Sequence, residues 1–154
     1  MKTQYNSHKY ILALPDRRSV NANGTSTDNG ITFEVEDYGA NPSTNERIIA
    51  LKSIYGNYLA ATECKNPSDP FDPQCDVTAD RYNEEFEGAK FEVKHNQKNQ
   101  YWFQTHWTLE DTLGRENPLY LKPYANGNLK GDGTRYDLRK WAKFTPECVE
   151  GIES

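Results

Sequence analysis

Three segments of the chain share one layout of strand and turn residues, and this repeat limits the possible folds more than any other feature. Each copy contains a Tyr followed by an apolar residue, then an apolar residue just before a turn, then a strand carrying a Phe. The three sets are Tyr10, Val20 and Phe33; Tyr58, Val77 and Phe91; and Tyr120, Leu129 and Phe144. The second and third positions are separated by 13, 14 and 15 residues in the three copies. Because one copy cannot bury its apolar face alone, the three are expected to close around a pseudo-threefold axis.

The middle copy carries an insertion. Its first and second positions are 19 residues apart, against 10 and 9 in the other copies, and the excess matches the Pro-rich stretch from Cys64 to Cys75. Such an insertion is best tolerated at a hairpin tip. A disulfide between Cys64 and Cys75 would stabilise the fold by roughly 3 kcal/mol on the chain-entropy model. The alternative is a pair of free thiols in a reducing compartment, and Cys148 has no obvious partner.

Short strand signals dominate the rest of the chain, and Gly, Asn, Asp and Pro separate them. The clearest are residues 11–14, 32–35, 47–52, 90–93 and 101–104. No window carries a helical apolar stripe over three turns, and only residues 108–113 are expected to fit a single helical turn. The sequence predicts one all-β domain over residues 1–154 with about twelve strands. Its repeats span roughly residues 2–38, 46–95 and 100–147.

The middle copy also carries a family resemblance. Its matching segments are Leu51-Lys52-Ser53, Gly56, Tyr58-Leu59-Ala60, Val77-Thr78-Ala79-Asp80-Arg81 and Phe91-Glu92-Val93. This pattern resembles the repeat of fascin-type β-trefoils, and amaranthin-type agglutinins are similar at the same positions. The resemblance covers residues 47–93 and implies a β-trefoil fold, but these residues specify no ligand. Fascins carry four trefoils and this chain has one, and the Gln-x-Trp signature of ricin-type lectins is absent.

The charge of the chain excludes several classes of partner. A net charge of -5 and a pI near 5.2 argue against a general nucleic-acid binder. Residues 115–146 nevertheless carry 7 Lys and Arg against 3 Asp and Glu, which indicates either a solvated basic face or a local anion-binding or partner-binding patch. No apolar run approaches the roughly 20 residues that span a bilayer. No signal peptide is visible in the sequence. The expected location therefore depends on the cysteines: it is extracellular if Cys64 and Cys75 are bridged and cytoplasmic otherwise.

Catalytic and metal-binding chemistry finds little support in the sequence. The three histidines, His8, His95 and His106, are not at metal-ligand spacing from one another or from Cys. Nucleophile elbows and phosphate-binding loops are absent. Asp69, Asp72 and Asp76 in and beside the insertion lack the regular spacing of a calcium loop, and a solvated loop is the simpler interpretation. The chain is therefore expected to be no enzyme and to need no metal or cofactor.

Aromatic residues beside polar turns are typical of a sugar-binding site, because a sugar ring offers an apolar face for stacking and hydroxyls for hydrogen bonds. Two segments have this pattern, residues 104–108 and residues 124–136. The first supplies the candidate ligand-binding residues His106 and Trp107, and the second supplies Tyr124, Asn126, Asn128, Asp132, Arg135 and Tyr136. The competing interpretation is structural, with Trp107 capping the end of the barrel.

Three functions remain open at this stage. The first is a lectin-like domain that binds glycans, which fits a single trefoil, a disulfide loop and the resemblance to agglutinins. The second is a fascin-like protein that binds actin filaments, although a net charge of -5 slows encounter with an acidic filament. The third is a trefoil protease inhibitor that uses the insertion as its loop. Each is compatible with a homo-oligomer.

Overall fold

A computed structural model describes residues 2–3, 9–25, 27–65, 74–81, 87–98, 100–110, 113–134 and 144–145. Within these ranges the chain forms β-strands and two short 3-10 helices, without an α-helix, which confirms the all-β prediction. The strands are β1 (Lys2–Thr3), β2 (Tyr10–Ala13), β3 (Val20–Gly24), β4 (Phe33–Ala40), β5 (Arg47–Ser53), β6 (Tyr58–Ala61), β7 (Val77–Arg81), β8 (Phe91–His95), β9 (Tyr101–Glu110), β10 (Glu116–Pro123), β11 (Leu129–Gly133) and β12 (Phe144–Thr145). The 3-10 helices are η1 (Asn29–Ile31) and η2 (Glu87–Ala89).

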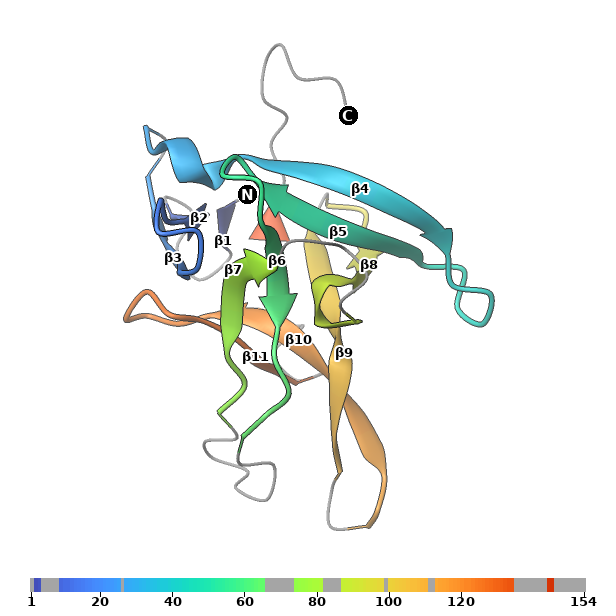
Figure 1. Cartoon of the computed structure of the whole chain (residues 1–154). Coiled ribbons are helices and arrows are strands. Elements are labelled where there is room, and N and C mark those ends of the chain that lie inside the picture. The colour runs from blue at the N-terminus through green and yellow to red at the C-terminus, as the bar shows by residue number, and fades with distance from the viewer. Residues whose placement is uncertain are drawn as a thin grey trace.

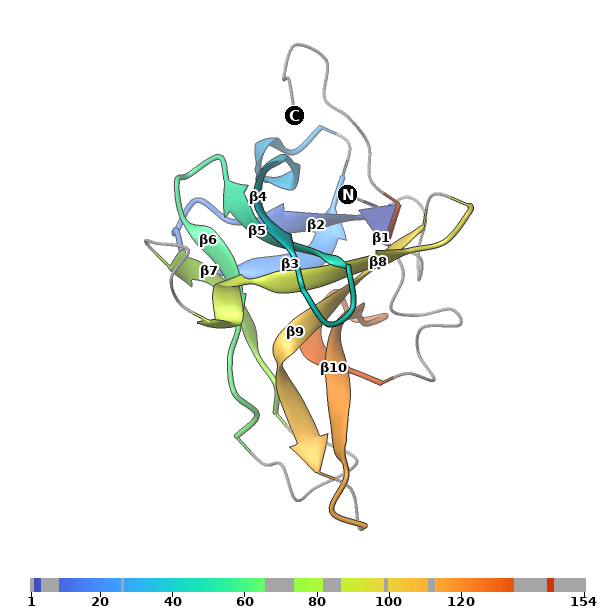
Figure 2. The same cartoon turned by 90° about the vertical axis from the view of Figure 1, so that its right-hand side faces the viewer.

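Six strands form one antiparallel series, in the order β4, β5, β8, β9, β12 and β1. Three hairpins branch from this series: β2–β3 continues from β1, β6–β7 from β5, and β10–β11 from β9. In Figure 1, β4 and β5 run together across the top of the molecule, and β9 extends with β10 to its lower end. Figure 2 keeps β9 and β10 side by side after a quarter turn. The first strand of each hairpin therefore pairs with one strand of the series.

The three hairpins repeat the same register. The tyrosine that opens each hairpin pairs with a residue near the end of the following strand, and the register then shifts by a bulge one or two residues later. These pairs are Tyr10↔Gly24, Tyr58↔Arg81 and Tyr120↔Gly133. All three tyrosines are buried. The shared bulge bends each hairpin in the same manner, because an extra residue on one strand increases its local twist.

The core gathers around the phenylalanines of the repeat. Phe91 and Phe144 are fully buried, and the ring of Phe103 lies 6.4 Å and 5.6 Å from theirs. Phe33 differs, because it is only half-buried and packs against the edge of this cluster. Its strand β4 pairs with β5 and with no other strand of the described ranges. The Phe of the repeat is thus a fully buried core residue in two copies, while that of the first copy lies less deeply.

The predicted insertion lies between β6 and β7, at the tip of the middle hairpin. The predicted disulfide is present, with the Cα atoms of Cys64 and Cys75 4.1 Å apart. The expected helical turn at residues 108–113 is wrong, because β9 runs to Glu110 and pairs with β10 through Leu109↔Asn117 and Glu110↔Glu116. The side chains of β9 alternate between inward and outward from Phe103 to Glu110, so the segment follows the period of a strand and not that of a helix.

Candidate functional site

The turn ends of the three hairpins meet one another through backbone hydrogen bonds. In each bond, an amide of one hairpin's second strand donates to a carbonyl at the tip of the next hairpin. The bonds run from Ala22 to Gly127, from Ala79 to Arg18 and from Gly131 to Cys75, and each measures 2.8 Å. Every acceptor lies two residues before the apolar residue that opens β3, β7 or β11. The ring therefore relates the three hairpins cyclically and holds their tips around one centre.

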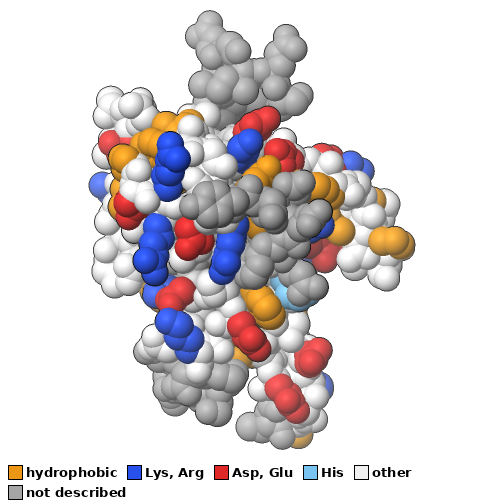
Figure 3. Space-filling view, in the orientation of Figure 1, with side chains coloured by type: hydrophobic (Ala, Val, Ile, Leu, Met, Phe, Trp, Pro, Cys, Tyr) orange, Lys and Arg blue, Asp and Glu red, His pale blue; other side chains and the backbone are white. Residues whose placement is uncertain are grey.

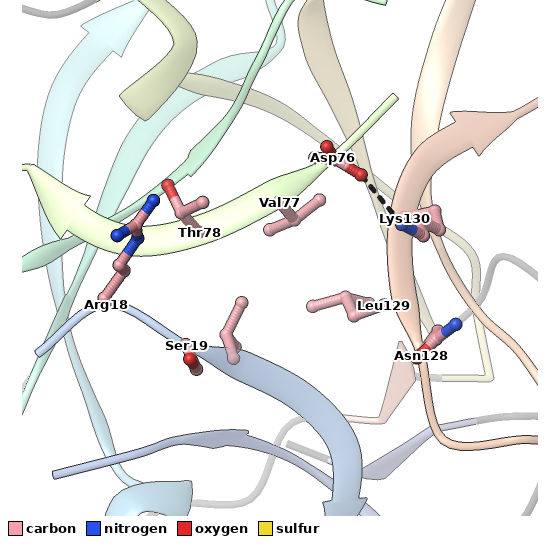
Figure 4. Close-up of a pocket in the computed structure, with 9 residues that line it drawn as sticks. Arg18, Ser19, Asp76, Val77, Thr78, Asn128, Leu129 and Lys130 are labelled. Atoms are coloured by element: carbon pink, nitrogen blue, oxygen red, sulfur yellow. Dashed lines mark hydrogen bonds and ion pairs between the residues drawn. The ribbon is translucent and has the colours of Figure 1, made fainter. Parts of the chain in front are cut away.

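A pocket of about 240 Å³ opens at this centre. Its apolar floor consists of Val20, Val77 and Leu129, the equivalent first residues of β3, β7 and β11. In Figure 4 the side chains of Val77 and Leu129 both point into the space between their strands. Polar residues surround the floor, and they are Arg18, Ser19, Asp76, Thr78, Asn128 and Lys130. The pocket thus combines an apolar base with donors and acceptors supplied by all three hairpins.

The tip of the first hairpin is shaped by Asp16. Its carboxylate accepts hydrogen bonds from the amides of Arg18 and Ser19 at 2.9 Å and 2.8 Å, and from the Ser19 hydroxyl at 2.6 Å. The hydroxyl of Ser19 and these amides lower the pKa of Asp16 below its usual value. An aspartate that bonds the backbone two and three residues ahead is typical of a tight turn. This turn places Arg18 and Ser19 at the rim.

The tip of the second hairpin is held by the disulfide. Cys75 and Cys64 are both buried and pack against Leu119. The carbonyl of the next residue, Asp76, accepts hydrogen bonds from the amide of Thr62 at 2.9 Å and from its hydroxyl at 3.2 Å. Covalent and hydrogen-bonded restraints therefore fix the backbone that carries Asp76 into the pocket wall.

An ion pair crosses from the second hairpin to the third. Lys130 donates to Asp76 Oδ1 at 2.7 Å, and the ammonium of Lys65 lies 3.4 Å from the other carboxylate oxygen. The hydrogen bond from Lys130 lowers the pKa of Asp76, and Lys65 adds to this effect against the opposing effect of burial. Asp76 is therefore ionised at neutral pH, with two cations beside it and Arg18 elsewhere on the same rim.

Trp107 and His106, the first predicted pair of ligand residues, lie on β9 away from this pocket. Their rings meet edge to face at 4.8 Å. Trp107 is half-buried, donates its indole N–H to the carbonyl of Ala61 at 2.7 Å and packs against the core and the disulfide cluster. These contacts give Trp107 a structural role, and its role in ligand binding stays a prediction.

The second predicted group lies on the β10–β11 hairpin. The Tyr124 hydroxyl donates to Asp132 at 2.7 Å, and the ammonium of Lys122 lies 4.9 Å from the Tyr124 ring. Asn126 Oδ1 accepts a bond from the amide of Asn128 and so shapes the turn. Only Asn128 of this group lines the pocket.

Two further predicted ligand residues, Arg135 and Tyr136, lie outside the described residues, as do Asp69 and Asp72. The sequence reasoning missed the rim residues Arg18, Ser19, Thr78 and Lys130 as candidates. A usable signal was present, because they flank the equivalent residues Val20, Val77 and Leu129 of the repeat. The ring of backbone hydrogen bonds between the hairpin tips brings these positions together.

In the described part of the chain, the acidic, His and Cys side chains form no cluster of three that could hold a metal ion. The described residues also include no helix long and apolar enough to cross a bilayer. No protein-family profile matches the chain, and no similar sequence is found among curated proteins.

Proposed function

We propose that the chain is a β-trefoil domain that binds carbohydrate without catalysis, and that the pocket between the three hairpin tips is its binding site. Three features support the trefoil assignment. A series of six antiparallel strands carries three hairpins, these hairpins share one register and bulge, and their tips bond to one another in a cycle. This arrangement fits three repeats around one axis.

The carbohydrate assignment depends on one observation, the apolar floor inside a polar rim. A pyranose ring presents C–H groups on one face and hydroxyls at its edge. Val20, Val77 and Leu129 offer an apolar surface to that face, and the rim surrounds it with groups able to bond hydroxyls. Binding sites of this kind use few polar groups to fix orientation over an apolar base.

The rim supplies both acceptors and donors. Ser19 donates its hydroxyl proton to Asp16 and Thr78 donates its own to Asp80 at 2.8 Å, so both oxygens keep lone pairs for a sugar hydroxyl. Arg18 and the Asn128 amide contribute N–H donors. A vicinal diol, which both donates and accepts, matches this mixture better than an apolar ligand does.

The disulfide bears on the choice between the glycan and actin functions. A buried Cys64–Cys75 bridge is typical of proteins in oxidising compartments, whereas actin filaments lie in a reducing one. The inhibitor alternative depends on the central part of the insertion, residues 66–73, which lies outside the described residues. The glycan function is therefore the one we propose.

A glycan array with the folded protein tests this proposal. The wild-type protein is expected to bind a defined set of oligosaccharides. Asn128→Trp, which places a large ring on an exposed rim position, is expected to abolish that binding. Asn29→Trp is the matched control, because it adds the same ring at an exposed Asn outside the pocket.

Circular dichroism and thermal unfolding would verify that both variants remain folded. Absence of glycan binding by the folded wild-type protein would contradict the proposed function. Equal binding by the wild-type protein and Asn128→Trp would instead show that sugars bind elsewhere on the domain.

A further inference from the structure

Arg18 is the cation of the pocket that donates no side-chain hydrogen bond to a described carboxylate, although its charge helps to lower the pKa of Asp16 two residues earlier. Its guanidinium forms neither a hydrogen bond nor an ion pair with another described residue. The side chain is exposed, and Figure 4 draws it beside Thr78 at the edge of the pocket. A guanidinium presents five N–H donors in a rigid fork, so these N–H groups of Arg18 can donate hydrogen bonds to a ligand.

The backbone of Arg18 is fixed although its side chain is exposed. Its amide donates to Asp16 and its carbonyl accepts from Ala79, so both sides of the residue are tied to neighbouring segments. The preceding residue, Arg17, adopts a left-handed φ of 58°, which turns the chain into this position. A ligand that binds the guanidinium therefore orders a side chain and leaves the backbone as it is.

The remaining charges of the rim do not cancel that of Arg18. Asp76 is the one carboxylate among the lining residues, and Lys130 pairs with it directly. Lys65 stands on the opposite side of the same carboxylate, with its side chain 72% exposed. Lys130, Lys65 and Arg18 thus stand against the two carboxylates of Asp76 and Asp16, which leaves one net positive charge around the pocket on a chain of net charge -5. On the face drawn in Figure 3, Lys and Arg side chains gather over β3, β7 and β11, with acidic side chains between them.

We propose that the sugar bound in this pocket is an anionic one, and that Arg18 is the residue that selects it by pairing with its carboxylate or sulfate group. This inference rests on the proposed function, because the sugar ring still lies over Val20, Val77 and Leu129. Arginine binds carboxylate and sulfate through two parallel N–H···O bonds, which fixes orientation as well as charge. A neutral sugar can accept single N–H bonds from Arg18 but offers no anion to pair with both arms of the fork.

The test is an array that presents oligosaccharides in matched pairs, in which the members differ only in one acidic group. Sialylated, uronate-containing and sulfated sugars form separate arms, so the source of the charge is identified. The acidic member of a pair is expected to bind at least tenfold more tightly, which corresponds to about 1.4 kcal/mol. That preference should weaken as salt is raised from low to physiological concentration.

Substitutions then assign the preference to one residue. Arg18→Gln is expected to remove most of the difference between the paired sugars, because it weakens binding of the acidic member much more than binding of the neutral one. Arg18→Lys should retain part of the preference, because it keeps the charge and loses the fork. Arg17→Gln is the matched control, since it removes the same charge from the same turn at a position that does not line the pocket.

Two results would overturn the inference while leaving the proposed function intact. One is binding of neutral glycans with no gain from an acidic group. The other is an acidic preference that Arg18→Gln and Arg17→Gln reduce equally. Failure of every glycan to bind would overturn the proposed function and this inference together.

Discussion

The indole nitrogen of Trp107 donates a 2.7 Å hydrogen bond to the carbonyl oxygen of Ala61, which joins β9 to the end of β6. The same ring packs against the core and against the cluster of Cys64, Cys75 and Leu119. Trp107 thus holds β9 against the end of β6 and against the disulfide at the base of the insertion. These contacts explain why the ring is half-buried without any need for a bound ligand.

We therefore expect Trp107→Phe to reduce stability and to leave glycan binding intact. The variant keeps an aromatic ring but removes the donor to the Ala61 carbonyl, which should cost roughly 1–3 kcal/mol. Urea unfolding measures the loss, and titration with a glycan selected on the array measures binding. If Trp107 stacked on the sugar, the affinity would fall sharply while the stability changed little.

The disulfide should stabilise the domain to a measurable extent. Replacement of Cys64 and Cys75 by Ala opens a loop with a sequence separation of 11, which should cost about 3 kcal/mol on the chain-entropy model. Urea unfolding of the variant and of the oxidised wild-type protein gives the difference. Cys148→Ser is the control, because it removes a thiol that is outside the bridge. Equal stabilities would mean that the bridge does not form in solution.

Much of the fold could be predicted from the spacing of a few residues. Tyr58 and Val77 lie farther apart than their equivalents, and that difference located the insertion between β6 and β7 correctly. Such spacing is informative because each copy must place a Tyr, an apolar residue and a Phe at fixed points of one hairpin and strand. The disulfide prediction depended on the two cysteines that bracket this Pro-rich stretch, and it is confirmed.

Other features depend on contacts between segments that lie far apart in the sequence. The half-buried position of Phe33 follows from the limited pairing of β4, and no local pattern separates it from Phe91. Residues 101–110 are a different case, because their alternation from Phe103 to Leu109 was a usable strand signal that the expected helical turn overlooked. Only the pairing of this strand with β8, β10 and β12 depends on distant segments.

The candidate site was the least predictable part of the molecule. Its rim residues are ordinary polar side chains on three hairpins, and none forms a motif with its sequence neighbours. Ser19 and Thr78 acquire a role only because the ring of backbone bonds brings their hairpins together. Aromatic residues were a misleading guide to the pocket, since its floor is aliphatic.

A side chain at position 127 is expected to lower the free energy of unfolding. The φ of Gly127, +90°, is one that other residues rarely adopt, and a Cβ atom there would lie 1.8 Å from Nδ2 of Asn23. Gly39 has a φ of +93° with open space around it, so Gly39→Ala isolates the backbone cost of roughly 1–2 kcal/mol. Gly127→Ala should lose more than this in chemical unfolding.

A double substitution separates the two costs at Gly127. Adding Asn23→Ala to Gly127→Ala removes the atoms that clash, so the combined variant should recover the steric part of the loss and keep the backbone part. Thermal unfolding of the two single variants and the double variant gives the coupling between the sites. Strict additivity would mean that Asn23 moves away at no cost.

The ion pair between Asp76 and Lys130 predicts how stability depends on pH. The pKa of Asp76 is lowered in the folded protein, chiefly by the hydrogen bond from Lys130, from a reference value of 3.8. A carboxyl group whose pKa is lower in the folded state stabilises that state at every pH above its unfolded pKa. The stabilisation is then lost as the pH falls through the folded pKa, because the protonated group no longer attracts the ammonium.

Asp76→Asn should therefore be less stable than the wild-type protein at pH 7, and the difference should vanish in strong acid. Urea unfolding between pH 7 and pH 2 measures both curves. The same substitution in a Lys130→Met background is the control, since the removal of the ammonium eliminates the main cause of the lowered pKa. In that background the difference between Asp and Asn should depend far less on pH. If it kept its full pH dependence, Lys65 rather than Lys130 would be the cation that holds Asp76 in its ionised form.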